Sequence, residues 1–99
     1  MDPDWAALVA HAQEMGDWST LGSAERLRLN GWYRMVFRLY EDAHYQFRLG
    51  TLDPELWAGY EVGLTQNMEG GDFRYACSQQ GPRLSPPFRE LVDSIIAAQ

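Results

Sequence analysis

The chain contains no lysine and a single cysteine among its 99 residues. All eight basic residues are arginines, and fourteen carboxylates outnumber them, which gives a formal net charge of −6. Because proteins bind phosphate backbones through clustered Lys and Arg, this balance argues against a direct nucleic-acid partner. Cys77 cannot form an internal disulfide, so nothing indicates an oxidising compartment.

Long apolar runs are also missing. No stretch approaches the roughly 20 residues of a transmembrane helix, and Asp2 and Asp4 are atypical of a signal peptide. We therefore expect a soluble cytoplasmic protein without a membrane span. With 45% hydrophobic and 13% aromatic residues, residues 1–99 have enough apolar material to form one folded domain.

The familiar catalytic signatures are absent as well. Gly70-Gly71 lacks the spacing and the following lysine of a phosphate-binding loop. The chain has no Gly-x-Ser-x-Gly, no Cys-x-x-Cys and no His-Glu-x-x-His. These absences favour a non-catalytic protein without a cofactor over an enzyme.

What the sequence does contain is a series of helix signals. A cap residue precedes a proline three times, at Asp2-Pro3, Asp53-Pro54 and Ser85-Pro86. Ser23 and Asp72 are expected to cap two further helices, and Gly50 supplies the positive φ typical of a helix C-terminus. No segment alternates polar and apolar residues over the length of a strand.

These signals predict an all-α fold, a small bundle of four or five helices around one long helix over about residues 24–49. Shorter helices are expected near residues 2–15, 54–67, 73–80 and 86–96. The long helix would measure about 39 Å, whereas a domain of this size has a radius of gyration of only about 13 Å. We expect it either to bend at Asn30-Gly31 or to protrude into a homodimer.

Apolar residues recur at helical spacing in three of these segments and predict the buried faces. The expected faces are Leu29, Trp32, Tyr33, Val36, Tyr40, Ala43 and Phe47 in the long helix, Trp57, Tyr60 and Leu64 in the next, and Phe88, Leu91, Val92, Ile95 and Ile96 in the last.

A polar row follows the opposite face of the long helix. Its members, spaced four and three residues apart, are Arg34, Arg38, Glu41, Tyr45 and Arg48. Three interpretations remain open: a buried polar network that holds neighbouring helices in register, a solvated face with Arg38 paired to Glu41 or Asp42, and a clamp for an anion or an acidic partner.

Trp18 lies in a polar connector, where burial within one chain is not assured. It either tucks back onto the helices of its own domain or serves as an interface aromatic.

Two weaker candidate sites, one for a metal and one for a nucleophile and its base, involve His44. Glu41-x-x-His44 has the spacing found in carboxylate-bridged di-iron bundles, but a second copy of the motif is missing. Cys77 could form a nucleophile and base pair with His11 or His44, although a buried structural thiol is the commoner role of a free cysteine. We therefore assign no catalytic residue and no metal ligand.

The run from Glu41 to Trp57 carries a family resemblance. Glu41-Asp42-Ala43-His44-Tyr45-Gln46, then Gly50-Thr51-Leu52-Asp53 and Trp57, resembles a group of uncharacterised bacterial helical domains, many of which follow a membrane helix. The resemblance extends from about Ser23 to the C-terminus and implies a helical fold without implying an activity. This chain differs in starting with a soluble helix around Trp5 and in having Tyr75-Ala76-Cys77 where an aromatic pair is expected.

Taken together, these features predict a non-catalytic protein-interaction or assembly module with an unknown protein partner, and they favour a homodimer. The first alternative is an acidic inhibitor that imitates nucleic acid and binds a nucleic-acid-binding protein. Five arginines interrupt the acidic residues on the longest helix and weigh against it. The second alternative is a small metal- or cofactor-binding helical enzyme.

Overall fold

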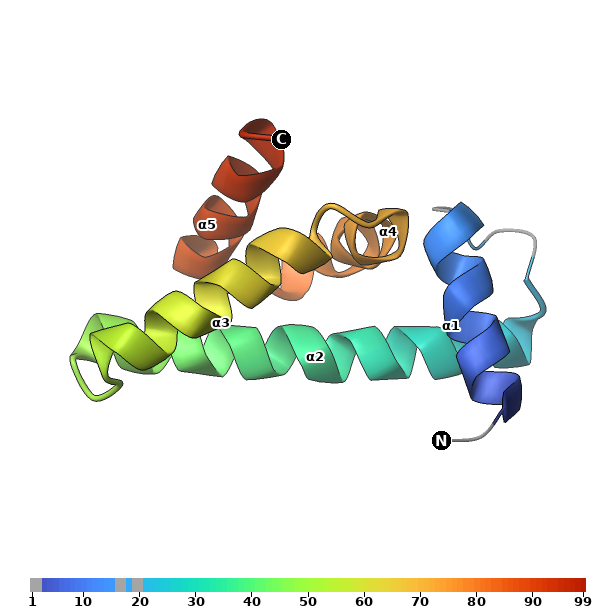
Figure 1. Cartoon of the computed structure of the whole chain (residues 1–99), viewed down its shortest axis with the longest axis horizontal. Coiled ribbons are helices and arrows are strands. Elements are labelled where there is room, and N and C mark those ends of the chain that lie inside the picture. The colour runs from blue at the N-terminus through green and yellow to red at the C-terminus, as the bar shows by residue number, and fades with distance from the viewer. Residues whose placement is uncertain (1–2, 16–17, 19–20) are drawn as a thin grey trace.

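The computed structural model describes residues 3–15, 18 and 21–99, and this part of the chain is all-α, with no strand. In chain order its elements are α1 (Pro3–Met15), α2 (Ser23–Leu49), α3 (Pro54–Asn67), α4 (Gly71–Gln80), the 3-10 turn η1 (Gly81–Arg83) and α5 (Pro86–Ala97) (Figure 1). The predicted fold class is therefore confirmed. The expected cap at Asp2 lies outside the described residues.

Helix α2 forms the long axis of the molecule. It is helical from Ser23 to Leu49 without a break at Asn30-Gly31, the position given for a bend, which was one of the two alternatives expected for this helix. Its length of about 40 Å nearly equals the longest dimension of the structure, 42 Å. The helices α3 and α5 lie along its C-terminal half, and α4 and α1 lie toward its N-terminal end (Figure 1). An elongated bundle thus accommodates the long helix.

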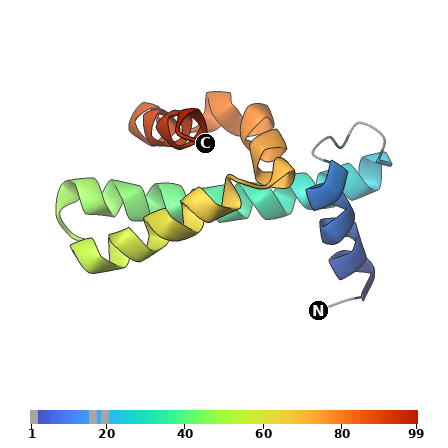
Figure 2. The same cartoon turned by 45° about the horizontal axis from the view of Figure 1, so that its top comes forward.

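The turn between α2 and α3 follows the prediction closely. Gly50 adopts a left-handed φ of 81°, which a residue with a Cβ adopts only with strain. The carboxylate of Asp53 accepts a hydrogen bond of 2.7 Å from the backbone N–H of Glu55, and Pro54 occupies the first helical position. The chain therefore reverses, and α3 runs back beside α2 (Figure 2).

Two other predicted caps are wrong, and a third is right in position only. Helix α2 begins after an extended Gly22, so Ser23 is already the first helical residue. Gly70 precedes α4, and the carboxylate of Asp72 turns into the core instead of capping the helix. Ser85 occupies the cap position of α5, but its hydroxyl makes no capping hydrogen bond.

The core lies between α2 and the helices packed around it. On α2 the buried side chains are spaced four residues apart, at Leu29, Tyr33 and Phe37. They pack in one cluster with side chains from all the later helices, which include Leu64, Met68, Ala76, Cys77, Phe88, Val92 and Ile95. The predicted apolar stripe of α5 is thus confirmed.

Some side chains predicted to be buried remain open to solvent. Trp32 and Phe47 lie at the edges of the buried face of α2, and Tyr60 of α3 is also exposed. Phe37, which had not been assigned to the buried face, lies at its centre. The face of α2 that packs against other helices is therefore narrower than predicted, and aromatic surface is left outside the core.

Candidate functional site

Tyr33 and Asp72 form a buried polar pair that the sequence analysis did not find. The Tyr33 hydroxyl donates a hydrogen bond to the Asp72 carboxylate, and both side chains are almost fully buried. Burial, followed by the hydrogen bond and the charge of Asp72, raises the pKa of Tyr33 above its ordinary range. Asp72 lies in the first turn of α4, where the helix dipole favours a carboxylate. The pair joins α4 to α2 and has a structural role.

The side chains of the predicted polar row on α2 differ in their exposure and in their contacts. Arg34 and Arg38 are exposed near the middle of the helix, and Glu41 is half-buried. Tyr45 is 53% exposed, and the Arg48 guanidinium lies over its ring at 5.4 Å from the centroid. The row as a whole therefore does not enter the core.

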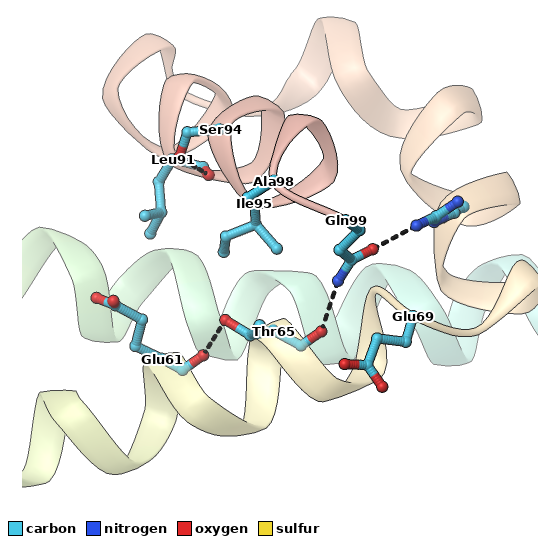
Figure 3. A pocket seen from close by; sticks show the side chains of 9 residues that line it. Glu61, Thr65, Glu69, Leu91, Ser94, Ile95, Ala98 and Gln99 are labelled. Atoms are coloured by element: carbon cyan, nitrogen blue, oxygen red, sulfur yellow. Dashed lines mark hydrogen bonds between the residues drawn. The ribbon is translucent and has the colours of Figure 1, made fainter.

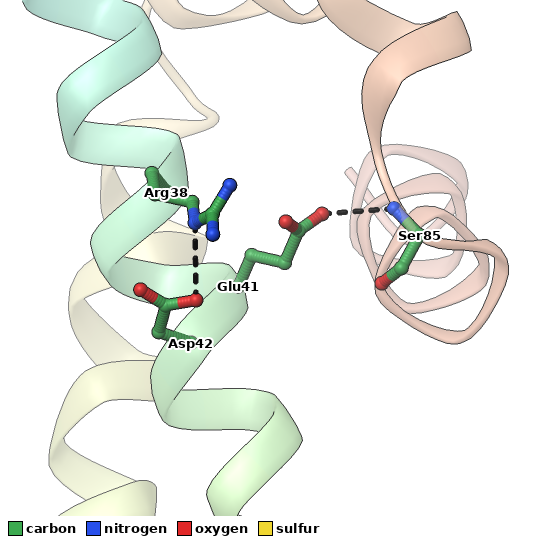
Figure 4. Close-up of polar contacts among 4 residues, drawn as sticks. All are labelled: Arg38, Glu41, Asp42 and Ser85. Carbon is green, nitrogen blue, oxygen red and sulfur yellow. Dashed lines mark hydrogen bonds and ion pairs between the residues drawn. The ribbon is translucent and has the colours of Figure 1, made fainter.

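Glu41 connects α2 to the start of α5. Its carboxylate accepts a hydrogen bond of 2.8 Å from the backbone N–H of Ser85, which lies 44 residues further along the chain. Figure 4 shows Glu41 reaching across to Ser85, whereas Arg38 and Asp42 pair along the surface of α2 through an Nε–Oδ1 distance of 3.2 Å. Glu41 thus supplies one inter-helix bond, as the network interpretation expected, while Arg38 and Asp42 behave as a solvated pair.

A pocket of about 150 Å³ gathers three arginines. Arg34, Arg38 and Glu41 line it from α2, and Gln80 and Arg83 line it from the end of α4 and from η1. We call this the arginine pocket; Phe37 and Leu84 complete its lining. Nothing in the sequence pattern indicated that Gln80 and Arg83 would join the polar row, because they lie some 40 residues away from it.

The surroundings of Cys77 and His44 do not favour the catalytic roles considered for these side chains. Burial raises the pKa of the Cys77 thiol, and the nearby Asp93 adds to this effect, so the nucleophilic thiolate is disfavoured. The His44 ring lies against Trp57 and Phe88, with centroid distances of 5.1 and 5.9 Å. Burial lowers the pKa of His44, which favours the neutral ring. In the described residues no group of three or more His, Cys, Asp or Glu side chains could hold a metal ion.

A groove of about 610 Å³ separates the facing sides of α3 and α5. Figure 3 shows Leu91 and Ile95 of α5 above Glu61 and Thr65 of α3 and above Glu69, which follows α3. The terminal Gln99 spans one end, donating to the Thr65 carbonyl at 3.0 Å and accepting a hydrogen bond from Arg74. These bonds hold α5 beside α3 and α4, and we interpret the groove as part of the packing.

Trp18 is one of the fully buried side chains of the molecule. Its ring packs against Tyr33 and Tyr75, with centroid distances of 5.2 and 4.9 Å. A ring without exposed area offers no surface to a partner, so Trp18 acts as a core aromatic of its own domain.

An exposed apolar surface follows the seam between α2 and α3. It consists of Trp32, Met35 and Leu39 on α2 and of Leu56 and Tyr60 on α3, and we call it the α2–α3 face. Met35, Leu39 and Leu56 are 48%, 61% and 60% exposed.

Tyr40 of α2 contacts the α3 part of the α2–α3 face. It lies edge-on to Tyr60 at 6.4 Å and lines a hollow of about 380 Å³ together with Leu56, Gly59 and Gly63. Contiguous apolar surface of this kind commonly marks an interaction site, whereas scattered apolar residues do not. The spacing of Trp32, Met35 and Leu39 by three and four residues was a sequence signal for this face.

None of the helices in the described part of the chain combines the length and the apolar character needed to cross a bilayer. No protein-family model, no curated protein and no solved structure matches the chain.

Proposed function

We propose that the protein is a non-catalytic assembly module that associates with a second copy of itself through the α2–α3 face. The observation that supports this most is the unbroken apolar row on the outside of the longest helix. At 3.6 residues per turn, Trp32, Met35 and Leu39 fall within an arc of about 60° on α2. Leu39, the most exposed residue of this row, is 61% exposed.

The charges beside this row favour a second copy as the occupant. Arg28 and Asp42 lie seven residues before and after Met35, on nearly the same side of α2. A two-fold interface brings the same patch of both copies together, so that residue i meets residue j and residue j meets residue i. With the two α2 helices antiparallel and Met35 at the axis, each Arg28 would face the Asp42 of the other copy. Asp42, which pairs with Arg38 of its own helix, would then lie between guanidinium groups of both copies, while Arg28 also lies over the Trp5 ring of its own chain.

The face is small for a dimer interface, because α1 lies against part of it. Trp5 of α1 packs edge-on against Trp32 at 5.8 Å between ring centroids, and the Arg28 guanidinium lies over the Trp5 ring. We therefore expect the two copies together to bury no more than about 1,200 Å², the lower end of the range for specific interfaces. We accordingly expect dissociation in the micromolar range rather than an obligate dimer.

Sedimentation velocity of three proteins tests this proposal. The wild type is expected to shift from monomer to dimer as its concentration rises. Leu39→Glu would place a charge in the middle of the interface and should leave only monomer at the same concentrations. Leu27→Glu is the matched control, because Leu27 is a leucine of the same helix, 74% exposed and outside the α2–α3 face; it should dimerise like the wild type.

Two outcomes would contradict the proposal. A wild type that stays monomeric up to millimolar concentration would show that the face is not a self-association surface. Equal effects of Leu39→Glu and Leu27→Glu would place the dimer contact elsewhere. Circular dichroism of each variant checks that the helices remain folded.

A further inference from the structure

We infer that the arginine pocket binds the phosphate dianion of a small phosphate ester or of inorganic phosphate. This site is separate from the α2–α3 face, because it lies between α2, α4 and η1 whereas the face lies on the α3 side of α2. The inference therefore does not depend on self-association.

The first support is the concentration of positive charge in an otherwise acidic protein. Three of the eight arginines line this one pocket. Arg34 and Arg38 are four residues apart on α2, a like-charge spacing that is unfavourable for the helix itself. The fold then adds Arg83 from η1 to the same cluster. An arrangement that is unfavourable without a counter-ion is the one expected at an anion site.

The second support is the number of unengaged donors. Within the described residues only one guanidinium of the three forms an ion pair, that of Arg38, and it uses Nε alone, toward Asp42. Arg34 and Arg83 make no side-chain hydrogen bond there. The single carboxylate in the lining, Glu41, is held by the Ser85 N–H. Most guanidinium N–H groups therefore remain available to a ligand.

The third support is the sign of the charge and the size of the pocket. Among the described residues the lining has three guanidinium groups and one carboxylate, and Asp42 beside Arg38 adds a second negative charge. The net charge of +1 attracts a phosphate monoester, which carries about −1.5 to −2 at neutral pH. The planar donor pairs of arginine suit the oxygens of a phosphate. A pocket of about 150 Å³ has room for a phosphate group and a small organic portion beside Leu84.

Titration of ¹⁵N-labelled protein with inorganic phosphate, at ionic strength held constant with sodium chloride, tests the inference. We expect saturable shifts of the backbone amides of Gln80, Gly81, Arg83 and Leu84. Affinity should rise with pH as inorganic phosphate loses its second proton and becomes the dianion. Phosphate should also raise the melting temperature of the wild type, because a ligand that binds only the folded state stabilises it.

Matched variants locate the site. Arg83→Met removes one guanidinium and should weaken phosphate binding roughly tenfold, and Arg34→Met should do the same. Arg48→Met is the control, because Arg48 belongs to α2 but lies outside the pocket, against Tyr45; its affinity should stay within about twofold of the wild type. Using two pocket variants on different elements keeps the test valid if one of them fails to fold.

Absence of saturable binding by the wild type would overturn the inference, as would equal weakening by Arg83→Met and Arg48→Met. Phenyl phosphate distinguishes the two sources of the anion. Tighter binding of phenyl phosphate than of inorganic phosphate assigns the pocket to a phosphate ester, and the reverse order assigns it to the free ion.

Discussion

Replacing Tyr33 with phenylalanine should destabilise the fold strongly, although it removes a single oxygen atom. The ring keeps its packing, including its edge-on contact with Phe73 at 4.9 Å. What is lost is the only side-chain hydrogen bond to Asp72 among the described residues. Asp72 is 2% exposed, so water cannot replace the donor without opening the core.

The expected loss can be given a magnitude. A hydrogen bond to a charged group contributes about 1.5–3 kcal/mol, and a carboxylate left buried without a partner adds a desolvation penalty. We expect Tyr33→Phe to lower the free energy of unfolding by about 2–3 kcal/mol. This is a large part of the roughly 5–15 kcal/mol available to a typical domain.

Urea denaturation of two tyrosine variants provides the assay. Tyr40→Phe is the control, because Tyr40 lies on the same helix, and its hydroxyl accepts a half-buried hydrogen bond of 2.9 Å from the neutral Asn67 amide. Loss of that bond should cost only about 1 kcal/mol. Equal and small losses in the two variants would refute the idea that the Tyr33–Asp72 pair is a main tie between α2 and α4.

The same pair should control stability at alkaline pH. Because the pKa of Tyr33 is raised in the folded state, its proton is lost first from the unfolded chain, above pH 10.0. The unfolded state then binds fewer protons than the native state, so stability falls as pH rises, by about 1.4 kcal/mol per pH unit for this one group. Tyr33→Phe should lack this component of the slope, and parallel alkaline curves for the two proteins would contradict the assignment.

Two further predictions concern the turn and the histidine. Asp53→Ala should lose about 1 kcal/mol through the missing cap of α3, and wild-type stability in a urea titration would mean that the 2.7 Å bond to Glu55 contributes nothing. Because burial lowers the pKa of His44, the wild type should be most stable above pH 6.5 and should lose stability as the pH falls below it. His44→Phe, which keeps an aromatic ring beside Trp57 and Phe88, should lose less stability over that range, and identical acid profiles would contradict the expected linkage.

The local parts of the fold could be predicted because their causes are local. Asp53-Pro54 marked the start of α3, and Gly50 marked the end of α2, since capping and positive φ depend on a few adjacent residues. The stripe of α5 followed from the 3.6-residue period alone.

The parts that could not be predicted depend on distant residues. Asp72 looked like a cap in sequence, but packing brings its carboxylate to the Tyr33 hydroxyl, 39 positions away. Arg83 likewise reaches the arginines of α2 only through the path of α4 and η1. The apolar row from Trp32 to Leu39 could be seen in the sequence, yet its exposure could not, because another helix could have covered it.

The central claim, self-association through the α2–α3 face, is tested most directly by following the backbone amide spectrum of the wild type on dilution from millimolar to micromolar concentration. We expect the amide chemical shifts to change with protein concentration, and the changes to be largest near Met35 and Leu39 of α2 and near Leu56 and Tyr60 of α3. A spectrum that does not change with concentration, or changes confined to α4 and α5, would contradict the claim.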